Sequence, residues 1–153
     1  GALNVACQGV GGGYRAELAS NTLPAGTDAD AIQEGIDMFK LAAKNCPDSK
    51  IVFGGYSQGS AVMLNAVPKL DAAILKLVVG GVFYGYTKNE QKDGQLPGFP
   101  SENLEVFCRE DDGICDGNLV VTAGHFAYTS DGSIQEGAQF LVNRFAAAGS
   151  ATN

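Results

Sequence analysis

Ser57 is the side chain of this sequence best suited to covalent chemistry. It stands at the centre of GYSQG (residues 55–59), which follows the apolar run Ile51–Phe53 and precedes a helical stretch. A G-x-S-x-G segment between a strand and a helix holds a nucleophilic serine on a sharp turn above the sheet edge. We expect side chains at Gly55 or Gly59 to collide with the neighbouring backbone. The helix N-terminus beneath the serine would favour a developing oxyanion.

His125 can serve as the base for this serine. It is the only histidine of the chain, and it follows Ser57 in the order serine, acid, histidine that this motif uses. A neutral imidazole accepts the serine proton and returns it to the leaving alcohol. Taken alone, a single histidine is more often a surface or core residue than a catalyst.

The acid that orients His125 is left open by the residues alone. The aspartates between the two are Asp93, Asp111, Asp112 and Asp116. The loop 108–115, closed by cysteines, would hold Asp111 or Asp112 rigidly, which is what orienting an imidazole requires. The remaining aspartates are interpreted as solvated loop charges.

The cysteines favour an oxidising compartment over a metal site. Cys108 and Cys115 enclose a short loop rich in Asp and Gly, which predicts a disulfide and hence a secreted protein. Two reduced thiols in a cytosolic protein are the alternative. The cysteine spacing lacks the close pairs of a zinc site, and the one histidine is needed elsewhere. We therefore predict no metal and no cofactor.

Composition excludes several other classes of function. The chain has 153 residues, enough for a single domain spanning 1–153, and 45% of them are hydrophobic, as in globular proteins. Its formal net charge of −7 repels nucleic acid, and no basic cluster reverses this locally. No apolar run reaches the roughly 18–20 residues of a membrane span.

Alternating short apolar runs and helical patterns must position the reactive residues. Strands are expected at Leu3–Ala6, Ile51–Phe53, Leu77–Tyr84 and Leu104–Phe107. Helices are expected from Thr27 or Asp28 to Asn45, and over Ser57–Ala66, Asp71–Leu75 and Asp131–Ala147. Residues 85–103 read as a long surface loop. This order predicts an α/β fold, a mainly parallel central sheet with helices on both faces.

Beyond single motifs, the sequence resembles the fungal cutinase family, in the cutinase and acetylxylan esterase group of α/β-hydrolases. The segments that carry the resemblance are QGVGGGYRA (8–16), NTLPAGT (21–27), CPDSKIVFGGYSQGSA (46–61), GYTKN (85–89), VFCREDDGIC (106–115) and HFAY (125–128). They run along nearly the whole chain. The resemblance implies a three-layer α/β-hydrolase sandwich.

The resemblance also implies roles for individual residues. Ser57 would be the nucleophile, Asp112 the acid and His125 the base. Gln58 would give its backbone N–H to the oxyanion hole, and Asn21 would brace a second donor. Substrate-binding positions would be Leu18, Asn21, Tyr56, Ile114, Leu119, Val121 and Phe126.

The family begins with a further segment that nothing in this sequence matches. That segment holds a central strand and a loop whose Ser or Thr completes the oxyanion hole. In related cutinases the counterpart of Cys46 pairs with a cysteine of that segment, and where a member has a counterpart of Cys7, its partner lies there too. We hypothesise that it is a separate N-terminal peptide, disulfide-linked through these two cysteines. The alternative is that the sequence is only part of the protein.

The resulting expectation is a secreted, monomeric serine ester hydrolase. Its substrates would be the plant polyester cutin and esters of short-to-medium acyl chains, cleaved through an acyl-enzyme. An acetylxylan esterase is the alternative enzyme. A catalytically inactive fragment, or a domain that binds apolar surfaces, is the alternative of a different class.

Overall fold

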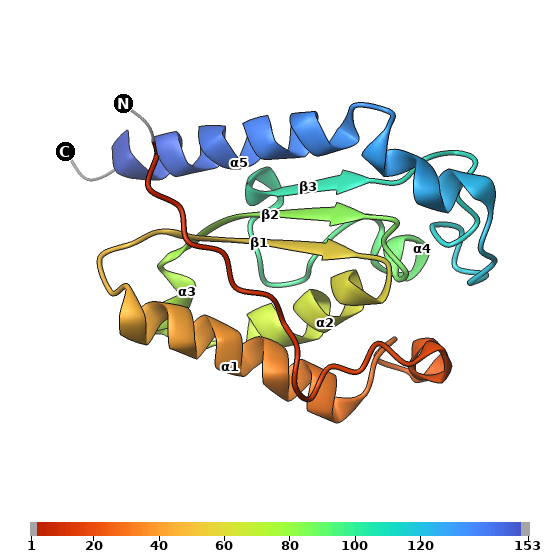
Figure 1. The fold of residues 1–153 in the computed structure, drawn as a ribbon, viewed down its shortest axis with the longest axis horizontal. Coiled ribbons are helices and arrows are strands. Elements are labelled where there is room, and N and C mark those ends of the chain that lie inside the picture. Colours follow the sequence, from red (N-terminus) through yellow and green to blue (C-terminus); the bar gives the residue numbers. More distant parts are fainter. Residues whose placement is uncertain (1–2, 151–153) are drawn as a thin grey trace.

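Three parallel strands form the centre of the molecule. The computed structural model describes residues 3–150. Within them, β1 (Ile51–Tyr56), β2 (Val78–Tyr84) and β3 (Leu104–Phe107) form a sheet in the order β1-β2-β3. Both pairings are parallel. The carboxyl ends of the three strands therefore meet at one edge of the sheet, as Figure 1 shows.

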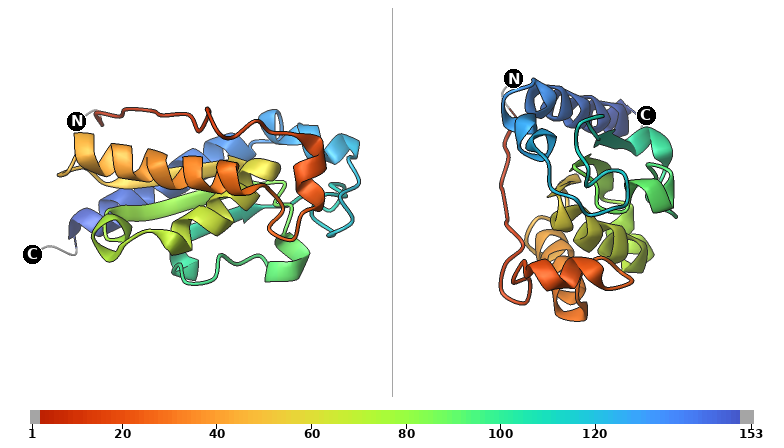
Figure 2. Two further views of the ribbon diagram at one scale, coloured as in Figure 1. Left: turned by 90° about the horizontal axis from the view of Figure 1, so that it is seen from below. Right: turned by 90° about the vertical axis from the view of Figure 1, so that its right-hand side faces the viewer.

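Helices cover both faces of this sheet. Helices α1 (Ala29–Asn45) and α2 (Gln58–Ala66) lie on one face, and α5 (Ser133–Ser150) lies on the other (Figures 1 and 2). The shorter elements are α3 (Ala72–Leu75), α4 (Asn89–Lys92), and the 3₁₀ helices η1 (Leu18–Thr22), η2 (Val67–Lys69), η3 (Ser101–Asn103) and η4 (Ala123–Thr129). The predicted three-layer α/β arrangement is confirmed.

Helix α1 forms where the sequence predicted it. The Asp28 carboxylate accepts a hydrogen bond from the Ala31 N–H at 2.8 Å and so caps the first turn. Ile32, Ile36 and Phe39 recur on one face of the helix and are buried. Phe39 meets the Phe53 ring of β1 edge to face, with 6.0 Å between ring centroids. The amphipathic face thus joins α1 to the core above the sheet.

Residues 85–103 are more ordered than a surface loop. They contain α4, and the side chains of Tyr86, Thr87, Leu96 and Phe99 are buried. The Phe99 and Phe53 rings lie 5.5 Å apart. The prediction of a surface loop was wrong here because apolar residues scattered between glycines and prolines still close one end of the core.

The strand expected at Leu3–Ala6 is not formed. Residues 3–10 have no assigned secondary structure, and the side chains of Leu3 and Val5 are exposed. Figures 1 and 2 show this segment crossing the molecule from the α5 side toward α1 without joining the sheet. An apolar run becomes a strand only when it finds a pairing partner and a face to bury.

Strand β1 lies at an edge of the sheet. Among the described residues, β2 is its one strand neighbour, so its other side carries unpaired backbone groups. On the α5 face, Val52, Gly54 and Tyr56 stay exposed. The α5 helix packs over β2 instead, since a side chain at Gly80 would touch Arg144 of that helix.

Within residues 3–150, none of the helices combines the length and the apolar character that crossing a membrane requires.

Candidate active site

The turn between β1 and α2 has the backbone of a strained nucleophile elbow. Ser57 adopts φ 54° and ψ −124°, a conformation that a non-glycine residue rarely takes. A side chain at Gly55 would lie 2.7 Å from the Gly59 carbonyl carbon. The expected collision is therefore found at Gly55. It is absent at Gly59, where a Cβ would meet no atom within 4 Å, because its side-chain direction points to open space.

The structure brings Ser57, His125 and Asp112 into one hydrogen-bonded chain. His125 Nε2 lies 2.9 Å from Ser57 Oγ, and His125 Nδ1 lies 2.9 Å from Asp112 Oδ2 and 3.1 Å from Oδ1. The three residues follow β1, lie in η4, and follow β3, respectively. The parallel sheet thus gathers residues far apart in sequence at its carboxyl edge, where ligands of open α/β sheets bind.

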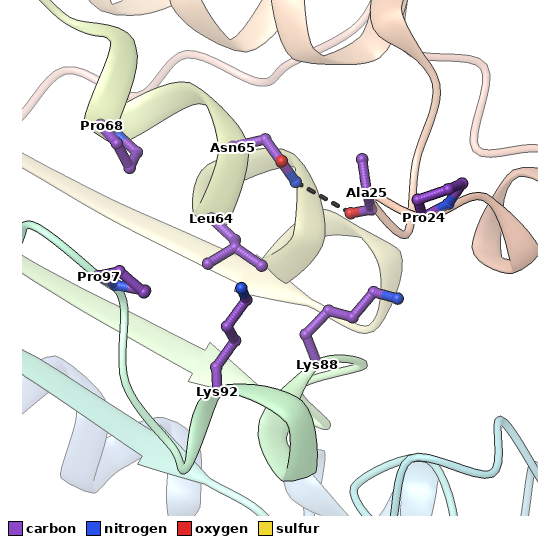
Figure 3. Close-up of a pocket in the computed structure, with 8 residues that line it drawn as sticks. All are labelled: Pro24, Ala25, Leu64, Asn65, Pro68, Lys88, Lys92 and Pro97. Atoms are coloured by element: carbon purple, nitrogen blue, oxygen red, sulfur yellow. Dashed lines mark hydrogen bonds between the residues drawn. The ribbon is translucent and has the colours of Figure 1, made fainter.

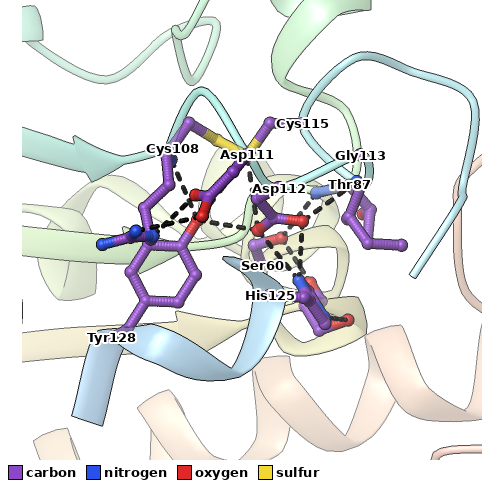
Figure 4. The surroundings of a disulfide bond; sticks show 12 residues. Ser60, Thr87, Cys108, Asp111, Asp112, Gly113, Cys115, His125 and Tyr128 are labelled. Atoms are coloured by element: carbon purple, nitrogen blue, oxygen red, sulfur yellow. Dashed lines mark hydrogen bonds and ion pairs between the residues drawn. A yellow bond between two sulfur atoms is a disulfide. The ribbon is translucent and has the colours of Figure 1, made fainter. Parts of the chain in front are cut away.

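Asp112 is fully buried and fully hydrogen-bonded. Its side chain is 0% exposed. Besides His125, its carboxylate accepts the Ile114 N–H at 3.0 Å. It also accepts the Tyr128 hydroxyl at 2.7 Å, as Figure 4 shows. A buried carboxylate needs such donors, because desolvation otherwise disfavours its charge. This environment fixes the direction in which the carboxylate faces the imidazole.

Asp111, the neighbouring candidate for the acid, faces the other way. Its side chain is 59% exposed and pairs with the Arg109 guanidinium at 2.8 Å. This hydrogen bond lowers the pKa of Asp111. The geometry therefore separates two adjacent acids that the residues alone left equivalent.

The loop that carries both acids is closed by the predicted disulfide. Cys108 and Cys115 are bonded, and their Cα atoms lie 5.8 Å apart (Figure 4). Within the loop the Asp112 N–H donates to the Arg109 carbonyl, and the Cys115 N–H donates to the Asp112 carbonyl. The covalent link and these turns hold Asp112 at the end of β3.

Gln58 follows Ser57 directly, and Asn21, the other residue predicted for the oxyanion hole, lies in η1. Gln58 begins α2, so its N–H has no partner within the helix. Its side-chain amide donates to the Glu17 carbonyl at 2.9 Å, while the Asn21 amide donates to the Leu18 carbonyl at 3.0 Å. The amide oxygens of both side chains are buried without a hydrogen-bond partner among the described residues. Two buried acceptors of predicted site residues therefore lack a donor among the described residues.

Tyr56 and Gly85 enclose the imidazole. The Tyr56 ring stacks on His125 with centroids 4.9 Å apart, and its hydroxyl donates to the His125 carbonyl at 2.7 Å. Burial, and then the Asp112 charge, raise the pKa of Tyr56. Gly85 has φ 58°, and a Cβ there would lie 2.7 Å from His125 Cε1. A glycine is thus required beside the imidazole.

The predicted substrate-binding residues divide into exposed and buried groups. Leu18 is 84% exposed, Phe126 is 64% exposed, and Val121 is also exposed. Leu119 is half-buried with φ 54°. Ile114 is buried beneath the triad, where its backbone supports Asp112. Leu18, Val121 and Phe126 therefore present exposed apolar surface, which we call the apolar rim.

A separate pocket of about 220 Å³ lies away from this rim, between α2, α4 and the segment after η1 (Figure 3). It is lined by Pro24, Ala25, Leu64, Asn65, Pro68, Lys88, Lys92 and Pro97. None of the predicted site residues belongs to this lining.

Two residues in contact with the triad had no predicted role. Tyr128 touches Asp112, and Gly85 touches His125. Both lie inside segments that carry the family resemblance, HFAY and GYTKN. Their roles depend on contacts between segments, which no local pattern encodes.

Proteins named cutinases are similar in sequence to this chain over most of its length. Cutinase 3 of Emericella nidulans is 49% identical over 144 residues, covering 94% of this chain and 64% of that protein. Cutinase CUT1 of Pyricularia oryzae is 50% identical over 127 residues, covering 83% of this chain and 56% of that protein. The chain thus spans less than two thirds of the length of these relatives.

Solved structures agree with this match. A Trichoderma reesei cutinase in complex with a phosphonate inhibitor superposes with a TM-score of 0.65 at 30% identity, covering 75% of this chain and 52% of that one. An acetylxylan esterase superposes with a TM-score of 0.63 at 20% identity, covering 79% and 72%, and shares the fold. The sequence profile of the cutinase family matches residues 1–145, and the chain therefore belongs to the cutinase family.

Proposed function

We propose that this chain carries the catalytic centre of a serine carboxylic ester hydrolase. The observation that carries the proposal is the relay from Ser57 through His125 to a buried Asp112, set on a strained turn at the carboxyl edge of the sheet. A nucleophile, a base and an orienting acid within hydrogen-bond reach are the requirements for acyl transfer.

In this mechanism Ser57 Oγ attacks the ester carbonyl carbon while His125 Nε2 takes its proton. The tetrahedral oxyanion is stabilised by the Gln58 N–H at the start of α2. The imidazolium, held by Asp112, then protonates the leaving alkoxide as the C–O bond breaks. Water, deprotonated by the same imidazole, attacks the acyl-enzyme and releases the acid and free Ser57.

The exposed apolar rim supports apolar esters as substrates. Leu18, Val121 and Phe126 offer hydrocarbon surface beside the serine, and matched relatives are named cutinases. We therefore propose cutin polyester and short-to-medium acyl esters as the substrate class. An acetyl group on a sugar would leave this rim unused, which disfavours an acetylxylan esterase.

Hydrolysis of p-nitrophenyl butyrate by wild type and variants tests the proposal. Ser57→Ala should abolish activity. Asp112→Asn should lower kcat by about 10⁴-fold, because the imidazole loses its orienting acceptor. Asp111→Asn is the matched control, since that side chain is exposed and ion-paired, and it should stay within about twofold of wild type.

A wild-type protein that neither hydrolyses the ester nor reacts with a fluorophosphonate at Ser57 would contradict the hydrolase and favour a surface-binding domain. Faster hydrolysis of acetyl than of butyryl esters would favour the acetylxylan esterase alternative.

We further propose a disulfide-linked peptide partner that supplies a strand beside β1. Three observations support it: the unpaired edge of β1, the exposed free thiols of Cys7 and Cys46, and the unpartnered amide oxygens of Asn21 and Gln58. The backbone N–H and hydroxyl groups of such a peptide would be the donors that these two oxygens lack. One such donor aimed at the oxyanion instead would complete the oxyanion hole, where one donor is worth about 10²–10³ in rate.

Intact-mass spectrometry of natively secreted protein, before and after reduction, tests the partner. The expected result is a non-reduced mass larger than that of this chain, which falls when the protein is reduced. A non-reduced mass that is unchanged by reductant, with Cys7 and Cys46 open to alkylation, would refute the linkage. Secretion and a single monomeric domain form part of the same proposal, supported by the Cys108–Cys115 disulfide.

A further inference from the structure

Tyr128 is a buried residue that the proposed mechanism leaves without a role. Its side chain is 2% exposed. Its hydroxyl donates to Asp112 Oδ2 at 2.7 Å and accepts the Arg109 N–H at 3.1 Å. Figure 4 shows the ring reaching from η4 to the carboxylate, beside the disulfide. Because the Tyr128 hydroxyl donates to one partner and accepts from another, a single orientation of its O–H bond satisfies both hydrogen bonds.

We propose that Tyr128 is a positioning residue that holds the Asp112 carboxylate in place for His125. The inference rests on the proposed hydrolase function, which it deepens. Asp112 Oδ2 accepts the Tyr128 hydroxyl and also lies 2.9 Å from His125 Nδ1. One oxygen is thus shared between the imidazole and the tyrosine, and the Ile114 N–H anchors the other oxygen.

The hydroxyl acts on both the direction and the charge of the carboxylate. Three donors around two oxygens prevent rotation about the Asp112 Cβ–Cγ bond. The tyrosine also draws part of the negative charge away from the imidazole. Burial raises the pKa of Tyr128, so the hydroxyl keeps the proton it donates.

Within residues 3–150, few other charged or titratable groups face the imidazole. Tyr56 covers its ring and Ser57 meets Nε2. The Arg109 guanidinium turns outward to Asp111 and Asp131. Asp112 is therefore the dominant charge beside His125. When the Tyr128 hydroxyl is removed, more of the negative charge of that carboxylate acts on the imidazole.

The experiment compares Tyr128→Phe with Tyr86→Phe in tag-free protein. Tyr86 is the matched control: it is fully buried, and its hydroxyl donates to the Gln95 carbonyl at 2.9 Å rather than to a residue of the triad. Because His125 is the only histidine, NMR of one imidazole reports the site whether or not ester is hydrolysed. Steady-state hydrolysis of p-nitrophenyl butyrate is measured alongside.

In Tyr128→Phe we expect the midpoint of the imidazole titration to rise by about 0.5 pH unit, because the carboxylate holds the imidazolium more strongly. We expect kcat to fall about tenfold with KM changed less than about twofold, since orientation matters in the transition state. Tyr86→Phe should change neither. In wild type, the Tyr128 hydroxyl proton should give a slowly exchanging resonance.

An unmoved titration midpoint would overturn the proposal even if kcat fell, because that pattern indicates a merely structural role. A rapidly exchanging Tyr128 hydroxyl proton in wild type would overturn it too, independently of whether the variant folds. A raised midpoint in protein that hydrolyses no ester would support the positioning role and refute the hydrolase function instead.

Discussion

Arg109 ties the disulfide loop to the start of α5. Its guanidinium meets Asp111 at 2.8 Å and Asp131 at 2.7 Å. Asp131 in turn accepts the Ser133 N–H at 2.9 Å and so caps α5. The hydrogen bonds from Ser133, and then the one from Arg109, lower the pKa of Asp131 to about 2. The charge of this one aspartate thus links the loop of the proposed acid to the following helix.

Replacing Asp131 with Asn should therefore destabilise the protein in a pH-dependent way. The folded state holds the pKa of this carboxyl near 2, below its usual value of 3.8, so its charge stabilises the fold fully above pH 3.8. This stabilisation is lost as the pH falls toward 2. Thermal unfolding of wild type and Asp131→Asn should show a lower Tm for the variant at pH 7.

The difference in Tm should shrink as the pH falls through this window. Asp30→Asn is the control, because Asp30 is an exposed acid whose nearest cation, Arg15, lies 3.8 Å away. A gap between wild type and Asp131→Asn that stays constant from pH 7 to pH 2 would contradict the linkage.

At the scale of elements, the strand-turn-helix unit leaves no room for a side chain at Gly55 but leaves room for one at Gly59. A Cβ at Gly55 would lie 2.7 Å from backbone atoms of Gly59 and Ser60, whereas a Cβ at Gly59 would meet no atom within 4 Å. Gly55→Ala should lower the free energy of unfolding by about 1–3 kcal/mol and abolish esterase activity, since backbone must shift beneath Ser57. Gly59→Ala should change stability by less than about 1 kcal/mol.

Denaturant unfolding and p-nitrophenyl butyrate hydrolysis measure both effects. Equal losses in the two variants would mean that the motif tolerates no side chain at either end, in conflict with the geometry.

The elements that the sequence predicted are those specified by local periodicity. The α1 stripe of Ile32, Ile36 and Phe39, and the apolar runs of β2 and β3, lie where expected. The run Leu3–Ala6 has the same local character, but it does not pair with the open edge of β1, and the side chains of Leu3 and Val5 stay exposed. Apolar periodicity thus indicates which secondary structure a segment can form, and contacts with other elements decide whether it forms.

The candidate site was predictable to the same extent. The GYSQG turn and the single histidine follow from local order along the chain. The choice between Asp111 and Asp112, and the contact from Tyr128, depend on which way a loop faces after folding. Family resemblance supplied the choice of Asp112, and only the contacts between η4 and the disulfide loop supply a reason for it.

At the scale of the whole molecule, apolar surface gathers at the carboxyl edge of the sheet. Leu18, Val120, Val121 and Phe126 are exposed on the loops and 3₁₀ helices that border Ser57. The chain carries a net charge of −7, which weakens binding to anionic surfaces but leaves apolar contact unaffected. An apolar rim around Ser57, the proposed nucleophile, is suited to an ester embedded in an uncharged, water-insoluble surface.

Polar substitutions in this rim should therefore separate insoluble from soluble substrates. Leu18→Ser and Phe126→Ser each remove apolar area that would be buried on contact, at about 25 cal/mol per Å², so hydrolysis of a polyester film should slow about tenfold or more. Hydrolysis of soluble p-nitrophenyl butyrate should change less than about threefold, because Ser57 and His125 keep their geometry.

Val142→Ser, at an exposed apolar position on α5, is the control and should leave both rates unchanged. Parallel losses on both substrates in the rim variants would show that these side chains bind the acyl group rather than the surface.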